Sequence, residues 1–425
     1  MIYRLRRWSA ALLLVMFLSL LSILQCFAAG TVSQVNLHIG QTPDAVYLTY
    51  SAPDAAQGAF SVTGPKGTAD YAANPVWSDS AGKYLYSAKV DGLAPDTNYT
   101  YNIAGSYSGT FKTPAETGAF TFVFLTDTQI GFAADAKATG AMFSLLNIRD
   151  DLAFAYIAGD MTDSSRNERQ WEMVFENGGV NSAAGQNFFG SHLIAAAQGN
   201  HDNSGVGPVV YAFDYSNVKF VILNMNNQDT WAAQANFLRQ QAADAKNNGK
   251  WLVACFHQSL YSGATHIVDS GIISARKFWS PLFAELGIDL VLQGHDHVYA
   301  RGFVTCTGSN ANLTAENNSY HVVSNIPLYI TGGHSGAVKW YAARNYQISA
   351  GDPLTPNYSF LDVNSAAPAQ NPWGTDTSKT HEQTYILINV KGDTMTISTY
   401  MFRYDGISDK MATPPYLYDS LTISR

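Results

Sequence analysis

The stretch AFTFVFLTDTQ, residues 119–129, joins an apolar run directly to a short polar cluster that contains Asp127 and Gln129. The same arrangement recurs four times along the chain: LAFAYIA precedes GDMTD, HLIAAAQ precedes GNHD, KWLVACF precedes His257, and GIDLVLQ precedes GHDH. Each apolar run has the length and composition of a buried β-strand. Because loops at the carboxyl ends of such strands can meet in one crevice, we expect the five clusters to form one site.

The clusters share oxygen and nitrogen side chains of the kinds that bind metal ions. The candidate ligands are Asp127, Gln129, Asp160, Asn200, His257, His295 and His297. Imidazole suits zinc or iron, and carboxylate and amide oxygens also admit manganese, so the set fits first-row metals. Two such ions about 3.5–4 Å apart clamp a phosphoryl group and lower the pKa of a bound water. The sequence therefore predicts a two-metal hydrolytic site.

Length and composition set the class of protein. At 425 residues the chain is long enough for two domains with a large core. The charged fraction is low, 14%, and the aromatic fraction is high, 13%, which argues for an ordered protein. The net charge is −8, and no basic run interleaves with aromatic residues, so we expect no nucleic-acid groove.

The beginning of the chain has the layout of a secretory signal peptide. Three arginines precede an apolar stretch, residues 10–24, which is followed by the small pair Ala28 and Ala29. We therefore predict a signal peptide at residues 1–29 and a secreted, periplasmic or cell-surface protein with no transmembrane segment after cleavage. The alternative is that the apolar stretch stays as a membrane anchor.

The sequence changes character near residue 115. Residues 30–115 contain short alternating strands separated by Asp, Gly, Pro and Asn, the pattern of an all-β sandwich. In residues 116–425, apolar strands alternate with helical patterns, which indicates an α/β layered core with strands that are parallel in part. The predicted helices span residues 136–148, 168–175, 231–247 and 275–286. Polar stretches at 305–320 and 350–380 are predicted to be long surface loops.

In this order, the five clusters resemble those of the metallophosphoesterase (calcineurin-like) superfamily, and within it those of the purple acid phosphatases. The segment RKFWSPLFAELGIDLVLQGHDHVYAR, residues 276–301, resembles the phosphatase branch, and GLAPDTNYTYNI, residues 92–103, resembles a fibronectin type III module. The resemblance implies an N-terminal fibronectin III-like β domain followed by a metallophosphoesterase β-sandwich core flanked by helices.

The resemblance also implies how the first metal is bound. Asp160 would bridge the two metals, and Asp127 and His297 would hold the first one. Gln129 stands where many members of the superfamily have a histidine ligand. Its amide oxygen is therefore expected either to coordinate weakly or to hydrogen-bond a ligated water.

For the second metal, the resemblance implies Asn200, His257 and His295 as ligands. His201 would face the substrate, either donating a proton to the leaving oxygen or binding phosphate. Asp202 would orient the ring of His201.

Three further positions bear on the chemistry. His266 matches a phosphate-contacting histidine of the phosphatase branch, and His334, in TGGHSG, is a candidate for the surroundings of the pocket. Purple acid phosphatases place a metal-binding tyrosine three residues after the bridging aspartate, where this chain has Asp163. We therefore expect no purple tyrosinate centre, but two divalent or mixed-valence ions of iron, manganese or zinc.

Taken together, these features predict an exported, acid phosphatase-like enzyme that hydrolyses phosphomonoesters of small molecules by attack of a metal-bound hydroxide. One alternative is a phosphodiesterase or nucleotidase with the same site. A further alternative is a surface-binding protein whose phosphoesterase domain is inactive.

Overall fold

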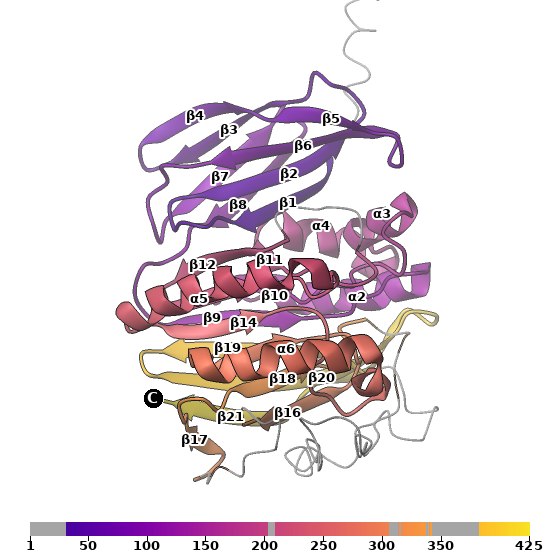
Figure 1. Cartoon of the computed structure of the whole chain (residues 1–425). Helices are drawn as coiled ribbons and strands as arrows, with labels where there is room; N and C mark the ends of the chain where they lie inside the picture. The colour runs from indigo at the N-terminus through magenta and orange to yellow at the C-terminus, as the bar shows by residue number, and fades with distance from the viewer. Residues whose placement is uncertain are drawn as a thin grey trace, which may run out of the picture.

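The computed structural model describes residues 31–202, 209–305, 313, 316–336, 339, 341 and 382–425. The predicted signal peptide and the predicted loop at 350–380 lie outside these residues, and the predicted loop at 305–320 lies partly outside them. Figure 1 shows a β-sandwich at the top of the molecule and, below it, layers of sheets and helices.

Eight strands form the N-terminal sandwich: β1 (Ser33–Ile39), β2 (Val46–Ala52), β3 (Ala59–Gly64), β4 (Gly67–Ala72), β5 (Asn74–Ser78), β6 (Lys83–Val90), β7 (Asn98–Ile103) and β8 (Tyr107–Lys112). Strands β4-β3-β7-β8 form one sheet, and β1-β2-β6-β5 face it (Figure 1). Exposed and buried residues alternate strictly along β7, so Tyr99, Tyr101 and Ile103 point into the sandwich. The predicted all-β organisation is confirmed, while the likeness to fibronectin type III stays a prediction.

Strand β1 joins the sandwich to the rest of the molecule. It pairs antiparallel with β2 on one side and parallel with β11 (Leu193–Ala196) on the other, with Leu37 opposite Leu193. The result is one eleven-stranded sheet of order β17-β21-β20-β19-β9-β10-β11-β1-β2-β6-β5. The sequence did not predict that the sandwich and the second half share a sheet.

The second half is built on two stacked sheets. Its other strands are β9 (Phe120–Leu125), β10 (Leu152–Ile157), β12 (Tyr211–Tyr215), β13 (Val218–Ile222), β14 (Trp251–Cys255), β15 (Leu290–Gln293), β16 (Tyr299–Phe303), β17 (Ser319–His321), β18 (Leu328–Gly332), β19 (Gln383–Lys391), β20 (Thr394–Asp405) and β21 (Lys410–Ser424). Strands β12-β13-β14-β15-β18-β16 form the second sheet. Phe122 and Phe154 of the first sheet each meet Phe220 of the second edge to face, at 5.2 Å between ring centroids. This aromatic contact lies in the core between the sheets.

Helices cover the outer face of each sheet, which gives the predicted layered α/β fold (Figure 1). Helices α2, α3 and α4 pack on the eleven-stranded sheet, and α5 and α6 pack on the six-stranded sheet. The helices are α2 (Ala133–Asn147), α3 (Glu168–Glu176), α4 (Ala184–Phe189), α5 (Trp231–Asn247) and α6 (Ser270–Leu286), with short 3-10 turns η1 (Gly179–Asn181), η2 (Gln228–Thr230) and η3 (Thr265–Val268). The four predicted helices are confirmed, and α6 begins five residues earlier than predicted.

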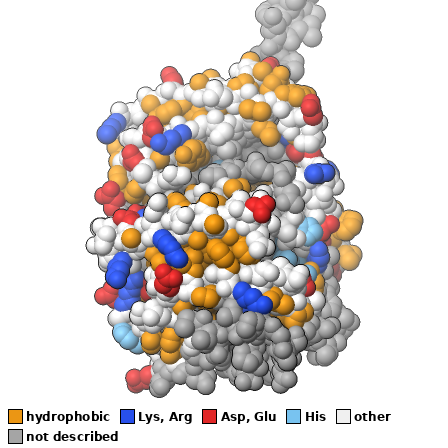
Figure 2. Space-filling model, viewed as in Figure 1, with side chains coloured by type: hydrophobic (Ala, Val, Ile, Leu, Met, Phe, Trp, Pro, Cys, Tyr) orange, Lys and Arg blue, Asp and Glu red, His pale blue; other side chains and the backbone are white. Residues whose placement is uncertain are grey.

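The outer face of α5 and α6 carries charged side chains around a hydrophobic area (Figure 2). Phe278 of α6 is 39% exposed and its ring meets that of Trp231 of α5 at 5.5 Å, so an exposed aromatic side chain lies at the contact between the two helices. Among the described residues, no helix has both the length and the apolar character needed to cross a membrane.

Candidate metal centre

The loops that follow five strands meet at one edge of the two stacked sheets. Strands β9, β10 and β11 run parallel in one sheet, and β14 and β15 run parallel in the other. Backbone bonds join the loops: the Asp127 N–H donates to the Gly159 carbonyl at 3.1 Å, and the Gly294 N–H donates to the His257 carbonyl at 2.8 Å. The five clusters therefore come together, as the sequence predicted.

His257 lies at the centre of the first group of side chains. Its Nδ1 is 2.6 Å from the carbonyl oxygen of Ala158, which can only accept, so Nδ1 carries a hydrogen and Nε2 has a lone pair whenever the ring is neutral. This lone pair faces Oδ2 of Asp160 at 3.2 Å, Oδ1 of Asn200 at 3.0 Å and Nδ1 of His295 at 3.2 Å. Ligands bound about 2.0–2.2 Å from one ion lie roughly 3 Å from each other. The spacing and the donor set therefore fit a metal ion.

In the metal-free site, the buried carboxylates favour a bound proton at His257. Burial opposes protonation of His257, but the carboxylates of Asp160 and Asp127 outweigh burial and raise its pKa to about 10. Burial and the neighbouring His257 together hold the pKa of His295 well below its usual value, so that ring is neutral. A neutral imidazole is the form that binds a metal.

A second group of ligand atoms lies around Asp127. Nδ1 of His297 donates to the carbonyl oxygen of Lys339, which leaves the Nε2 lone pair 3.3 Å from Oδ1 of Asp127. Oδ2 of Asp127 accepts from the Thr126 hydroxyl at 2.5 Å and from the backbone N–H of His295 at 2.8 Å. Oδ1 is buried and has no hydrogen-bond donor among the described residues. This oxygen and the His297 nitrogen would hold the other metal.

Gln129 belongs to the same group. Its side chain is 6% exposed, and its amide oxygen Oε1 is buried without a hydrogen-bond partner among the described residues. Its backbone N–H donates to the Asp160 carbonyl at 2.8 Å, which fixes it beside the bridging candidate. A buried acceptor left without a donor is costly unless a cation or a water satisfies it. Coordination by Gln129 therefore remains a prediction that its surroundings favour.

Five of the candidate ligands have a left-handed backbone conformation that non-glycine residues rarely adopt. The φ angles are +52° at Asp127, +37° at Gln129, +51° at Asp160, +70° at His295 and +47° at His297. Each such residue costs on the order of 1–3 kcal/mol and persists only where the surrounding structure imposes it. The positive φ angles turn the chain sharply as each strand ends, which places side chains two residues apart in one site.

Glycines in two of the clusters allow the loops to approach closely. A Cβ at Gly199 would lie 2.0 Å from Oδ1 of Asp160, and a Cβ at Gly294 would lie 2.0 Å from Oγ1 of Thr126. Neither position therefore has room for a side chain. The glycines of GNHD and GHDH are thus required by the packing of the metal-binding loops.

The structure corrects the predicted role of Asp202. Nδ1 of His201 donates to the carbonyl oxygen of Asp163 at 2.6 Å, so Asp163 orients this ring through its backbone. The Asp202 carboxylate instead accepts from the backbone N–H groups of Asp160 at 2.6 Å and Gly199 at 3.0 Å. The Asp202 carboxylate therefore accepts hydrogen bonds from backbone N–H groups of two metal-binding loops, as short polar side chains often do in turns.

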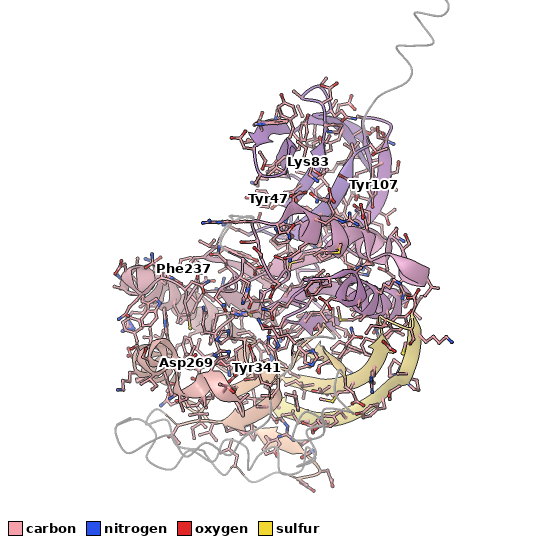
Figure 3. The ribbon with its side chains drawn as sticks, turned by 90° about the vertical axis from the view of Figure 1, so that its right-hand side faces the viewer. Tyr47, Lys83, Tyr107, Phe237, Asp269 and Tyr341 are labelled. Atoms are coloured by element: carbon pink, nitrogen blue, oxygen red, sulfur yellow. The ribbon has the colours of Figure 1, made fainter. Side chains whose placement is uncertain are left out.

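His266 lies beside the metal ligands, where the sequence placed it. Its ring centroid is 4.3 Å from that of His295, and its Nδ1 lies 2.7 Å from Oδ2 of Asp269. Figure 3 looks onto this side of the molecule and labels Asp269, with Tyr341 close by, below Lys83 of the sandwich. The ring of Tyr341 meets the ring of His266 at 5.1 Å, edge to face.

Sequence reasoning missed Asp296, which stands between the two histidines of GHDH. This carboxylate is fully buried. It accepts hydrogen bonds from the Ser262 hydroxyl and, at 3.0 Å, from the backbone N–H of His266. It therefore fixes the loop that carries His266. Its place inside the motif was the signal that could have identified it.

Sequence reasoning also missed Tyr341. Its ring centroid is 4.7 Å from that of His297, and burial, with Asp127 nearby, raises its pKa to about 12. No sequence pattern marks it, because it lies outside the five metal-binding clusters. His334 is buried with its ring 5.9 Å from His297, and its Nδ1 donates to the Gly336 carbonyl at 2.6 Å, so this candidate does lie near the site.

Comparison with known sequences agrees with this geometry. Residues 120–299 match the family model of the calcineurin-like phosphoesterases. An uncharacterized protein of Mycobacterium tuberculosis is 26% identical over 273 residues, which cover 51% of this chain and 48% of that protein. The chain therefore spans about half the length of the curated relatives it matches.

Two solved structures have the same fold. Purple acid phosphatase PPD1 from yellow lupin (Lupinus luteus) seeds superposes with a TM-score of 0.66 and 16% identity, over 93% of this chain and 75% of that one. The structure of PhoD superposes with a TM-score of 0.57 and 12% identity, over 92% of this chain and 89% of that one. Residues 120–299 thus match the calcineurin-like phosphoesterase family, and the chain has the fold of purple acid phosphatase PPD1 and of PhoD.

Proposed function

We propose that the protein is an exported, dinuclear metal-dependent phosphoesterase that hydrolyses phosphomonoesters of small molecules. The observation that carries the proposal is the convergence of potential metal-ligand atoms at His257 and at Asp127. Oxygen and imidazole acceptors there face one another at 3.0–3.3 Å. Export is proposed from the sequence of residues 1–29.

The residues present fit two metal ions. Asp160, Asn200, His257 and His295 would hold one of them, and Asp127 and His297, with Gln129, would hold the other. When bound, such a pair stabilises charge on the attacking and leaving oxygens of a phosphate ester and lowers the pKa of a bound water.

His201 would exchange a proton with the substrate at Nε2. Its Nδ1 hydrogen is held by the Asp163 carbonyl, so Nε2 is the atom at which the ring can gain or lose a proton. The backbone N–H of His201 donates to Oδ1 of Asp160 at 2.8 Å, so His201 is held next to the proposed bridging carboxylate. With Nδ1 beside the Asp269 carboxylate, His266 would likewise present Nε2 to the phosphate.

A phosphodiesterase or nucleotidase is the second candidate. Two residues favour it, because Gln129 replaces the usual histidine and Asp163 replaces the tyrosine of the purple acid phosphatases. Asp163 is half exposed and lies 3.7 Å from the ammonium group of Lys339, with which it forms an ion pair. Because residue 163 is not a tyrosine, it cannot give a metal ion a phenolate ligand.

The test compares turnover of 4-nitrophenyl phosphate and bis(4-nitrophenyl) phosphate by protein loaded with manganese, iron or zinc. We expect faster hydrolysis of the monoester, and we expect His201→Ala to lower kcat/KM by about 10²–10⁴. His321→Ala is the matched control, because His321 is exposed on β17, and it should leave kcat/KM unchanged. Faster hydrolysis of the diester selects the second candidate, and no hydrolysis of either ester contradicts both.

A further inference from the structure

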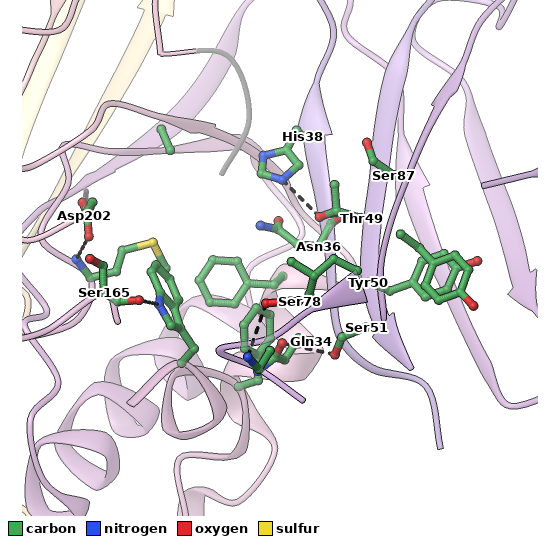
Figure 4. Close-up of a pocket in the computed structure, with 18 of the residues that line it drawn as sticks. Gln34, Asn36, His38, Thr49, Tyr50, Ser51, Ser78, Ser87, Ser165 and Asp202 are labelled. Carbon is green, nitrogen blue, oxygen red and sulfur yellow. Dashed lines mark hydrogen bonds between the residues drawn. The ribbon is translucent and has the colours of Figure 1, made fainter. Parts of the chain in front are cut away.

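A cavity of about 420 Å³ lies between the N-terminal sandwich and the second half of the molecule (Figure 4). Strands β1, β2, β5 and β6 form one wall, and α3, α4, the end of β11 and the loop after β10 form the other. The volume is in the range of small-molecule binding sites, which often lie between two structural units. None of the candidate metal ligands lines this cavity.

The wall contributed by the sandwich carries a cluster of polar side chains beside the apolar Val76 and Leu85. Asn36, His38 and Thr49 lie together on it, with Nε2 of His38 3.3 Å from Oγ1 of Thr49 (Figure 4). Oδ1 of Asn36 is buried and has no hydrogen-bond partner among the described residues. All three side chains line the cavity, so their other polar atoms are the ones that a ligand hydroxyl would meet.

The opposite wall is largely apolar. It includes Trp171 and Phe175 of α3, Phe189 of α4 and Ile194 of β11. The Trp171 ring is fixed because its Nε1 donates to the Ser165 carbonyl at 2.9 Å. The cavity therefore has hydrogen-bonding groups on one side and aromatic or aliphatic surface on the other.

The two carboxylates that line the cavity already have partners. Glu168 lies 2.5 Å from the Lys83 ammonium group and accepts from Gln34 at 2.8 Å. The Asp202 carboxylate accepts from backbone N–H groups, and burial lowers the pKa of His38 to about 4, so that ring is neutral at pH 7. No lysine or arginine is among the described residues that line the cavity. A free anion would therefore find no lysine or arginine among these described residues.

We propose that this cavity binds an uncharged, polyhydroxylated group of the carbohydrate class. Its hydroxyl edge would bond to Asn36, His38 and Thr49, and its C–H face would pack on the aromatic wall at Trp171. Sugars combine these two kinds of surface, hydroxyl groups on the edge of the ring and C–H groups on its face.

The group could come from two sources, a free neutral sugar or the sugar part of a phosphate ester. Ser165 lines the cavity, and its backbone N–H donates to the carbonyl oxygen of His201 at 3.2 Å, so the cavity adjoins the proposed substrate-facing residue. The second source rests on the proposed function, and the first does not.

Calorimetric titration of the full chain with glucose, maltose and myo-inositol tests the proposal without any turnover. We expect saturable binding of at least one probe, and about tenfold weaker binding by Asn36→Leu and by the isosteric Thr49→Val. Thr100→Val is the matched control, because Thr100 is exposed on β7 and does not line the cavity, and it should bind as the wild type does. Circular dichroism of each variant checks the fold.

A kinetic arm separates the two sources. If the bound sugar is part of the substrate, Asn36→Leu raises KM for glucose 6-phosphate and leaves KM for 4-nitrophenyl phosphate unchanged. If the bound sugar is a separate ligand, Asn36→Leu loses sugar binding and both KM values stay the same. The proposal is overturned if none of the three probes binds, or if Asn36→Leu and Thr49→Val bind them as tightly as Thr100→Val. An inactive enzyme that still binds sugar would refute the proposed function alone.

Discussion

Replacing Gly199 by alanine tests whether the metal-binding loops are packed as tightly as the structure indicates. The new Cβ would lie 2.0 Å from Oδ1 of Asp160 and 2.5 Å from its backbone nitrogen, whereas real Cβ atoms essentially never come within 3.0 Å of other atoms. Residue 199 and Asp160 must therefore move apart by about 1 Å, at an overpacking cost of roughly 1–3 kcal/mol. The displaced carboxylate is the one proposed to bridge the two metals.

A displacement of about 1 Å at a reacting centre can cost roughly 10²-fold in rate. We therefore expect Gly199→Ala to lower kcat/KM for 4-nitrophenyl phosphate by about 10²-fold and to reduce the bound metal. Gly271→Ala is the control, because a Cβ there meets nothing within 4 Å, and it should keep full activity. Wild-type activity and metal content in Gly199→Ala would refute the packing on which the site depends.

Three further predictions concern other parts of the account. Gln129→Ala should weaken metal binding by about 10–100-fold in a chelator competition, and unchanged affinity would show that its amide does not coordinate. His38 has a pKa of about 4 in the folded protein, below its unfolded value of 6.5, so its contribution to stability is present above pH 6.5 and lost as the pH falls towards 4. The loss of stability between pH 7.5 and pH 5, measured by urea unfolding, should therefore be about 2 kcal/mol smaller in His38→Gln than in the wild type. Asp419→Ala should lower the free energy of unfolding by about 3–5 kcal/mol, because it leaves the buried Arg301 guanidinium, 2.5 Å from the Asp419 carboxylate, without its ion-pair partner. An effect below about 1 kcal/mol, the range of exposed ion pairs, would contradict that prediction.

The sequence predicted the parts of the site that depend on local pattern. Apolar runs followed at once by polar clusters identified β9, β10, β11, β14 and β15 and the side chains at their ends. Parallel strands bring their carboxyl ends to one edge, so the convergence of Asp127, Asp160 and His257 followed from the order of elements alone.

Features that depend on long-range contacts escaped prediction. The parallel pairing of β1 with β11 joins segments more than 150 residues apart, and no local pattern encodes it. Asp202 was assigned to the His201 ring because it is the next residue, but the turn directs its carboxylate to the backbone of Asp160. The ring of Tyr341 lies beside that of His297, and neither periodicity nor a motif marks this tyrosine in the sequence.

Metal content is the most direct test of the central claim, that the converging acceptors at His257 and Asp127 hold two ions. Inductively coupled plasma mass spectrometry on protein loaded with first-row metals and freed of excess should give close to two ions per chain. Asp160→Asn, which removes charge from the proposed bridge without changing its size, should give markedly fewer. Metal-free wild-type protein after loading, or equal metal content in the two proteins, would contradict the account.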